Sequence, residues 1–147
     1  MRKKWNFLSL LAWLLSVMLS APVYAAQPVS LVGKWKAIDD RSGFTLVSVK
    51  ITQTQPYTYQ GHIIEAFNLP QQPQADLEHL KGFHILQNIK QDADHPDILL
   101  SAQVVDPTTK QTYQTKGRVR RQGNVMMLRS PSDNERSSRE ISWVRIR

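Results

Sequence analysis

Most of the chain beyond residue 30 alternates between apolar and polar positions, a period that is typical of β-strands with one buried face. The pattern predicts strands in seven stretches: Leu31–Ile38, Phe44–Gln53, Tyr57–Ala66, Ile98–Val105, Tyr113–Arg121, Val125–Arg129 and Glu140–Ile146. Turn-forming residues separate these stretches, and no helical pattern long enough for a crossover lies between them. Because parallel strands need such crossovers, we predict an antiparallel sheet.

The segment from residue 68 to residue 97 departs from this alternation. It begins with a stretch rich in proline and glutamine, after which Asp76 is placed to cap a short helix. Gly82–Lys90 fits either a helical turn or an eighth strand, because periodicity alone cannot assign a short apolar run. A short irregular or helical segment is therefore expected near residues 76–90.

A sheet of seven or eight antiparallel strands must close or fold over, because long open edges invite aggregation. Eight strands of about ten residues with short turns would use most of the chain beyond residue 25. We therefore predict an all-β fold, a single up-and-down β-barrel. A β-sandwich is the alternative architecture.

The first 25 residues have the pattern of a signal peptide. Residues 2–4 are basic, Phe7–Leu19 is an apolar run, and Val23–Ala25 fits the small-x-small cleavage rule. We therefore predict cleavage after Ala25, export to the periplasm and a mature domain of residues 26–147. The apolar run is short for a membrane span, which needs about 20 residues, so an uncleaved inner-membrane anchor is the less favoured alternative.

Composition and charge limit the kinds of functional site that the chain can form. The chain has 147 residues and no cysteine, which excludes disulfides, thiol catalysis, zinc–thiolate sites and a lipidated N-terminal cysteine. Its formal net charge is +7, and cleavage after Ala25 would remove three of the positive charges. Much of the remaining positive charge lies near the C-terminus, where Lys116, Arg118 and Arg120 would form a basic stripe on the outside of one strand.

The two ends of the predicted domain resemble a known fold. Gly33 and Trp35 open the first strand with a Gly-x-Trp motif, and Arg145 lies in the last strand. This pairing resembles the lipocalin and calycin barrels. The resemblance implies that Trp35 plugs one end of the barrel and that Arg145 lies across its ring, where a cation–π contact would stabilise it.

A wider set of stretches resembles a bacterial exported family known as domain of unknown function 2147. The stretches are GKWKAIDDRSG, VSVKI, YQGHIIE, KGFHILQNIK, VVDPTTKQTY and WVRIR, in this order over residues 31–147. The resemblance implies a small lipocalin-like barrel and carries no catalytic residues. Two positions depart from the family pattern, since Lys110 and Ser130 stand where members usually or often have glycine.

The alternation also predicts which side chains face the inside of the barrel. The inward set is Trp35, Val47, Val49, Ile51, Tyr57, Tyr59, Ile63, Leu100, Ala102, Val104, Tyr113, Val119 and Met127. The candidate ligand-binding residues within it are Trp35, Tyr57, Tyr59, Tyr113, Val49 and Leu100. Apolar contacts would supply affinity, and phenol hydroxyls would orient a polar group. An eight-stranded barrel is just wide enough to fill itself or to hold one small ligand, so both interpretations stay open.

Catalytic and metal chemistry have less support. The four histidines are His62, His79, His84 and His95, and their spacing matches no metal-binding motif. The serines lie in no recognisable nucleophile motif. We therefore expect no metal, no cofactor and no enzymatic activity.

Two functions remain open. The first is an exported soluble barrel that binds a small apolar or amphipathic ligand. The second is a cell-envelope protein with a filled barrel, whose basic stripe makes weak contact with an anionic surface or a partner. The alternative for the stripe is an ordinary solvated strand face. No nucleic-acid partner is expected for an exported protein, and the oligomeric state stays undetermined.

Overall fold

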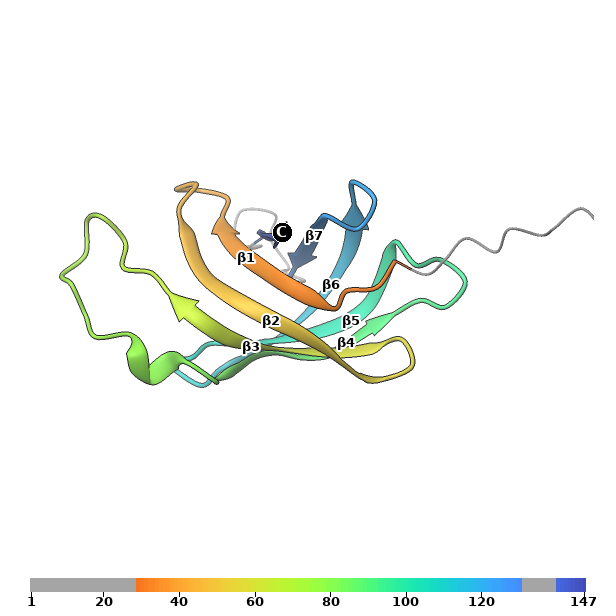
Figure 1. Ribbon diagram of the computed structural model, residues 1–147, viewed down its shortest axis with the longest axis horizontal. Coiled ribbons are helices and arrows are strands. Elements are labelled where there is room, and N and C mark those ends of the chain that lie inside the picture. Colours follow the sequence, from red (N-terminus) through yellow and green to blue (C-terminus); the bar gives the residue numbers. More distant parts are fainter. Residues whose placement is uncertain (1–28, 131–139) are drawn as a thin grey trace, which may run out of the picture.

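The computed structural model describes residues 29–130 and 140–147, and these residues form a closed antiparallel β-barrel (Figure 1). Each strand pairs with the next along the chain, and the last pairs with the first. The strands are β1 Gly33–Asp39, β2 Thr45–Gln55, β3 Thr58–Ala66, β4 His84–Gln91, β5 Ile98–Val105, β6 Thr112–Arg120, β7 Val125–Arg129 and β8 Glu140–Ile146. The predicted all-β up-and-down barrel is therefore confirmed.

The segment that the sequence left ambiguous contains the eighth strand. β4 occupies most of Gly82–Lys90 and pairs with both β3 and β5. The predicted short helix is a single 3₁₀ turn, Glu78–Leu80. The residue at the N-cap of this turn is Leu77 and not the predicted Asp76, whose carboxylate accepts a hydrogen bond from the Glu78 backbone N–H at 3.0 Å. Among the described residues, no helix has the length and apolar character to cross a membrane.

Connections alternate between the two ends of the barrel. Residues 29–32, the β2–β3 and β6–β7 turns and the β4–β5 loop lie at one end, which we call the closed end. The β1–β2 turn, the long β3–β4 loop and the β5–β6 turn lie at the other, which we call the open end and which is on the left in Figure 1.

The interior of the barrel is filled by apolar side chains. The largest fully buried ones are Trp35, Trp143, Leu31, Ile51, Ile63, Leu86, Ile89, Leu99, Met126, Leu128 and Val49. A side chain with no accessible surface adjoins no space large enough for a water molecule. The middle and the closed end of the barrel are therefore packed, and room for a ligand must be sought at the open end.

Bulges move some side chains out of the predicted register. β5 changes register between Leu99 and Ala102 in its pairing with β6. Leu99 and Ala102 are both buried, while Leu100 between them is 50% exposed. Because a bulge adds one residue to a strand, alternation counted through it assigns the wrong face. The prediction that Leu100 faces inward was therefore wrong.

The prediction for β7 was also wrong by one position. Met126 and Leu128 are buried against the core, and Met127 is on the outer side with partial exposure. The strand has only five residues, four of them apolar, so its sequence contains no alternation that could fix the register.

The β5–β6 turn has a lysine where the resembled family usually has glycine. Lys110 has a φ of +61°, a conformation that glycine adopts more readily than other residues. Its ammonium group donates a hydrogen bond to the Pro107 carbonyl at 2.7 Å and lies 4.2 Å from the centre of the Phe83 ring. These side-chain contacts give the turn a stabilisation that glycine would not provide.

Candidate ligand-binding site

At the closed end, Trp35 and Arg145 form the contact that the sequence predicted. Trp35 is fully buried, and its indole N–H donates to the Leu31 carbonyl at 2.9 Å. The Arg145 guanidinium carbon lies 4.4 Å from the centre of the Trp35 ring. Gly33 leaves room for the arginine, because a Cβ at that position would lie 2.8 Å from Arg145 Nη1.

The same guanidinium links three chain segments through hydrogen bonds. Arg145 donates from Nε to the Gly123 carbonyl at 2.9 Å, from Nη1 to Val32 at 2.7 Å and from Nη2 to Ser30 at 2.6 Å. Burial lowers the pKa of Arg145, but a guanidinium stays protonated at any ordinary pH. The sequence indicated the cation–π contact, and these three hydrogen bonds were not predicted.

A second polar contact at the closed end involves Tyr59 and Gln91. Tyr59 is 4% exposed, and its hydroxyl donates to Gln91 Oε1 at 3.0 Å. The Gln91 amide in turn donates to the carbonyls of Val29 at 2.9 Å and Pro96 at 2.6 Å. Burial is the main reason that the pKa of Tyr59 lies above its ordinary value. Because its hydroxyl is committed to Gln91, Tyr59 is part of the closed end and not of an open cavity.

Two other predicted tyrosines do not line the interior. Tyr57 lies in the β2–β3 turn with a φ of +58° and is 37% exposed. Tyr113 lies on the same face of β6 as the buried Thr115, but it is at the open end of the barrel. It is 43% exposed there, and its hydroxyl donates to Gln111 Oε1. Of the candidate ligand-binding residues, the structure therefore buries Trp35, Val49 and Tyr59 and leaves Tyr57, Tyr113 and Leu100 exposed.

A pocket of about 400 Å³ lies at the open end of the barrel. It is built from the β1–β2 turn, the start of β2, the β3–β4 loop and the start of β8. Its lining residues are Asp39, Asp40, Arg41, Leu46, Leu69, Glu140 and Ile141. Sequence analysis missed this site, because its residues come from four separate segments and those of the β1–β2 turn have an ordinary turn composition.

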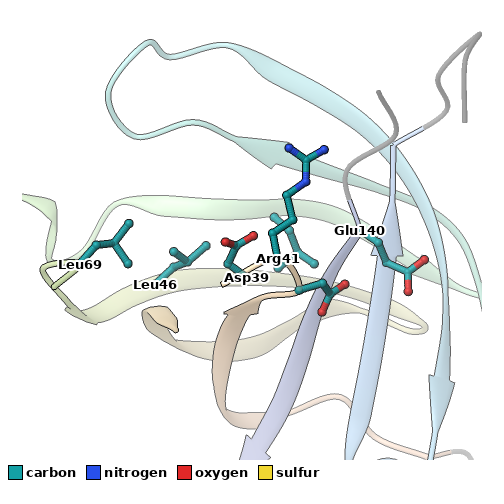
Figure 2. A pocket seen from close by; sticks show the side chains of 7 residues that line it. Asp39, Arg41, Leu46, Leu69 and Glu140 are labelled. Carbon is teal, nitrogen blue, oxygen red and sulfur yellow. The ribbon is translucent and has the colours of Figure 1, made fainter. Parts of the chain in front are cut away.

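The pocket is lined by both apolar and charged side chains. Figure 2 shows Leu69 and Leu46 on one side, Asp39 beside Leu46, and Arg41 and Glu140 beyond it. Three carboxylates and one guanidinium line the pocket, so its formal charge is negative. Two of the carboxylates are oriented by neighbours. Asp39 Oδ2 accepts a hydrogen bond from the Ser42 hydroxyl at 2.7 Å, and Asp40 Oδ1 accepts one from the Ser142 hydroxyl at 2.9 Å.

Trp143 lies one inward position below Ile141 on β8, between Ala37 of β1 and Met126 of β7. It is fully buried, and its indole N–H has no hydrogen-bond partner in the part of the chain that the structure describes. A buried donor without a partner costs about 1–3 kcal/mol. The buried N–H in the core layer beneath the pocket therefore lacks the kind of hydrogen bond that the Trp35 N–H makes at the closed end.

The histidines do not gather at either end. His62 and His84 meet edge to face on the outside of β3 and β4, with ring centres 6.0 Å apart, while His79 and His95 lie in different loops. Within residues 29–130 and 140–147, no three metal-ligating side chains cluster.

A second pocket of about 380 Å³ lies between the end of β3 and the β3–β4 loop. Its lining includes Asn68, whose side chain forms two hydrogen bonds with the Ala75 backbone.

The structure is similar to that of HP1028 from Helicobacter pylori, a protein described as belonging to the lipocalin family. The TM-score is 0.54 at 12% sequence identity, over 81% of this chain and 84% of that chain. The fold is that of a lipocalin. No protein-family model matches the sequence, and neither does any curated protein. The lipocalin-like barrel is thus shown, and membership of family 2147 stays a prediction.

Proposed function

We propose that this lipocalin-like barrel is an exported binding protein that takes a small amphipathic ligand, with a cationic head group, at its open end. The observation that carries the proposal is the pocket there, because apolar and charged side chains line one cavity. The HP1028 likeness is consistent with ligand binding only through the shared fold.

The apolar part of the ligand would pack on Leu46, Leu69 and Ile141. Its head group would lie among Asp39, Asp40 and Glu140, where the lining carboxylates outnumber the single guanidinium of Arg41. A negative lining favours a cation and disfavours a carboxylate, since like charges at short range repel. The ligand site differs from the predicted tyrosine-lined interior, whose middle is filled.

Binding to three amphiphiles would test this assignment. They share a dodecyl chain and differ only in the head group: an ammonium, an alcohol or a carboxylate. We expect affinity to fall in that order, with amide chemical shifts changing at Leu46, Leu69 and Ile141. Leu69→Ser should weaken all three, and Leu100→Ser, which alters an exposed leucine on the outside of β5, should weaken none.

A charge variant makes the test specific. Glu140→Gln should reduce the preference for the ammonium over the alcohol, and Glu65→Gln, outside this pocket, should leave the preference unchanged. The absence of binding at micromolar ligand, or shifts confined to the outer wall of the barrel, would refute the pocket assignment.

Export and family membership complete the proposal. Residues 1–25 have the charge, apolar run and cleavage site of a signal peptide, and they lie outside the described residues. N-terminal sequencing of the protein from a periplasmic extract should give Ala26 as the first residue. The stretches that resemble family 2147 occur in the family's order along the chain and agree with a lipocalin-like barrel. We infer that the activity of this chain is binding, with no catalytic step.

A further inference from the structure

The outer wall of the barrel formed by β2, β1, β8, β7 and β6 carries apolar side chains between two basic margins. Lys34 and Lys36 of β1 and Lys50 of β2 form one margin. Lys116, Arg118 and Arg120 of β6 form the other. The side chains between them are Val125 and Met127 of β7 and Val144 and Ile146 of β8, all partly exposed. We call this surface the basic–apolar face.

Strand pairing fixes how these side chains meet. Lys36 is opposite Val144, Val144 is opposite Val125, and Val125 is opposite Arg120. These four residues form one row across four strands, with a cation at each end and two valines in the middle. The adjacent row places Arg118 opposite Met127. The sequence predicted only the β6 stripe, because the lysines of β1 become its counterpart only when the barrel closes.

The basic margins are not neutralised within the described part of the chain. None of the six cations takes part in an ion pair there. Lys34 is directly opposite Lys50, an arrangement of like charges that weakens a sheet. Among the described residues these strands carry two acids: Asp39 of β1 lines the open-end pocket, and Glu140 of β8 is opposite Arg129. Among the described residues, the positive charge of the face therefore exceeds the negative charge beside it, and an anionic surface would relieve the resulting field.

We propose that the basic–apolar face docks on a bilayer that contains anionic phospholipids. Lysine and arginine side chains at both margins can reach lipid phosphates while their methylene stems lie along the wall. The partly exposed valines and Met127 between them would contact the interfacial region. Protein interfaces are depleted in lysine and enriched in aromatic residues, whereas this face has three lysines and an aliphatic centre.

The proposal is independent of the pocket at the open end, because the two sites share no residue. A ligand in the pocket contacts Ile141 on the inner side of β8, and the membrane contacts Val144 on its outer side. One site could therefore be lost while the other is retained.

Vesicle sedimentation tests the proposal with the protein as purified from the cells that make it. The vesicles contain phosphatidylglycerol and phosphatidylcholine in equal parts, and pure phosphatidylcholine vesicles are the comparison. We expect binding only to the anionic vesicles, and weaker binding as salt is raised. Removing one cation near an anionic surface weakens binding about fivefold, so Lys36→Gln with Arg120→Gln should weaken it roughly 25-fold.

Two further double variants separate the electrostatic contribution to vesicle binding from the apolar contribution. Lys81→Gln with Lys90→Gln removes the same charge from exposed positions outside the face and should change vesicle binding much less. Val125→Thr with Val144→Thr keeps the side-chain shape and the charge, and should weaken binding by a factor that salt does not alter. Far-UV circular dichroism checks that each variant retains the barrel.

Three results would overturn the proposal. The first is equal binding to neutral and anionic vesicles. The second is an equal loss of binding in the control pair Lys81→Gln with Lys90→Gln. The third is no binding to anionic vesicles at low salt; if a duplex DNA probe binds under those conditions, the face recognises nucleic acid and not lipid.

Discussion

The barrel buries two tryptophans, and their surroundings distinguish its two ends. At the closed end, Trp35 donates its N–H to the Leu31 carbonyl and lies under the Arg145 guanidinium. One inward position along β8 from Arg145, Trp143 is equally buried but its N–H has no partner among the described residues. Above Trp143 lies Ile141, which lines the open-end pocket. The buried indole N–H is thus hydrogen-bonded at the closed end, and the one nearer the open end has no hydrogen-bond partner among the described residues.

This difference indicates a division of roles along the barrel axis. At the closed end, the Arg145 side chain of β8 donates hydrogen bonds to the backbone carbonyls of Ser30 and Val32 and to that of Gly123 in the β6–β7 turn. The open end has carboxylates and leucines around a cavity. Stability should therefore depend mostly on the closed end, and binding on the open end.

The largest effect is expected at Trp35. Trp35→Ala should destabilise the protein by about 3–5 kcal/mol, because truncation of a buried aromatic leaves a cavity and removes its contacts. Urea unfolding followed by circular dichroism would measure the change. Tyr113→Ala is the control, since Tyr113 is 43% exposed, and it should stay within about 0.5 kcal/mol of the wild type. Equal effects of the two substitutions would mean that Trp35 is not the plug.

Trp35 also illustrates what the sequence could reveal. The alternation in β1 and β2 is regular, so the burial of Trp35, Val49 and Ile51 was predictable. The register of β5 was not, because the bulge between Leu99 and Ala102 depends on pairing with β6. Local sequence predicts a strand, whereas a bulge is set by the neighbouring strands.

The candidate site was harder to predict than the fold. Tyr57 was placed in a strand by its alternation with Tyr59, and the positive φ of the turn turned it away from the interior. The pocket arises because Leu69 in a long loop and Glu140 on β8 meet the β1–β2 turn. Such convergence is a property of the closed barrel, and single-sequence periodicity contains no information about it.

Arg145 should give the next largest effect. Arg145→Ala removes the cation–π contact and three hydrogen bonds to carbonyls, two of them exposed to water, so we expect a loss of about 1–3 kcal/mol. Arg145→Lys keeps the charge but cannot reach all three carbonyls, and should recover only part of the loss. Full recovery by lysine, measured by the same urea unfolding, would show that charge alone accounts for the role of this residue.

The closed end should also respond to alkaline pH through Tyr59. Burial raises the pKa of its phenol above the ordinary value of 10.0, because the neutral form is favoured in the folded state. The stability that this shift contributes is therefore fully present below pH 10 and is lost as the pH rises through the folded-state pKa. Tyr59→Phe should make the unfolding free energy less dependent on alkaline pH, at the cost of about 1 kcal/mol at neutral pH for the hydrogen bond to Gln91.

The smallest effect, and the most direct test of the comparison, is expected at Trp143. Trp143→Phe and Trp35→Phe remove the same ring volume from fully buried positions, so their packing losses are similar. Trp35→Phe also leaves the Leu31 carbonyl without its donor, whereas Trp143→Phe removes an N–H that has no partner. We therefore expect Trp143→Phe to be the milder substitution by about 1–3 kcal/mol, and its net effect to lie near zero. Measurement of both variants by urea unfolding isolates the contribution of the N–H group. If Trp143→Phe proves as destabilising as Trp35→Phe, the indole N–H of Trp143 has a partner in solution, and the two ends of the barrel are satisfied alike.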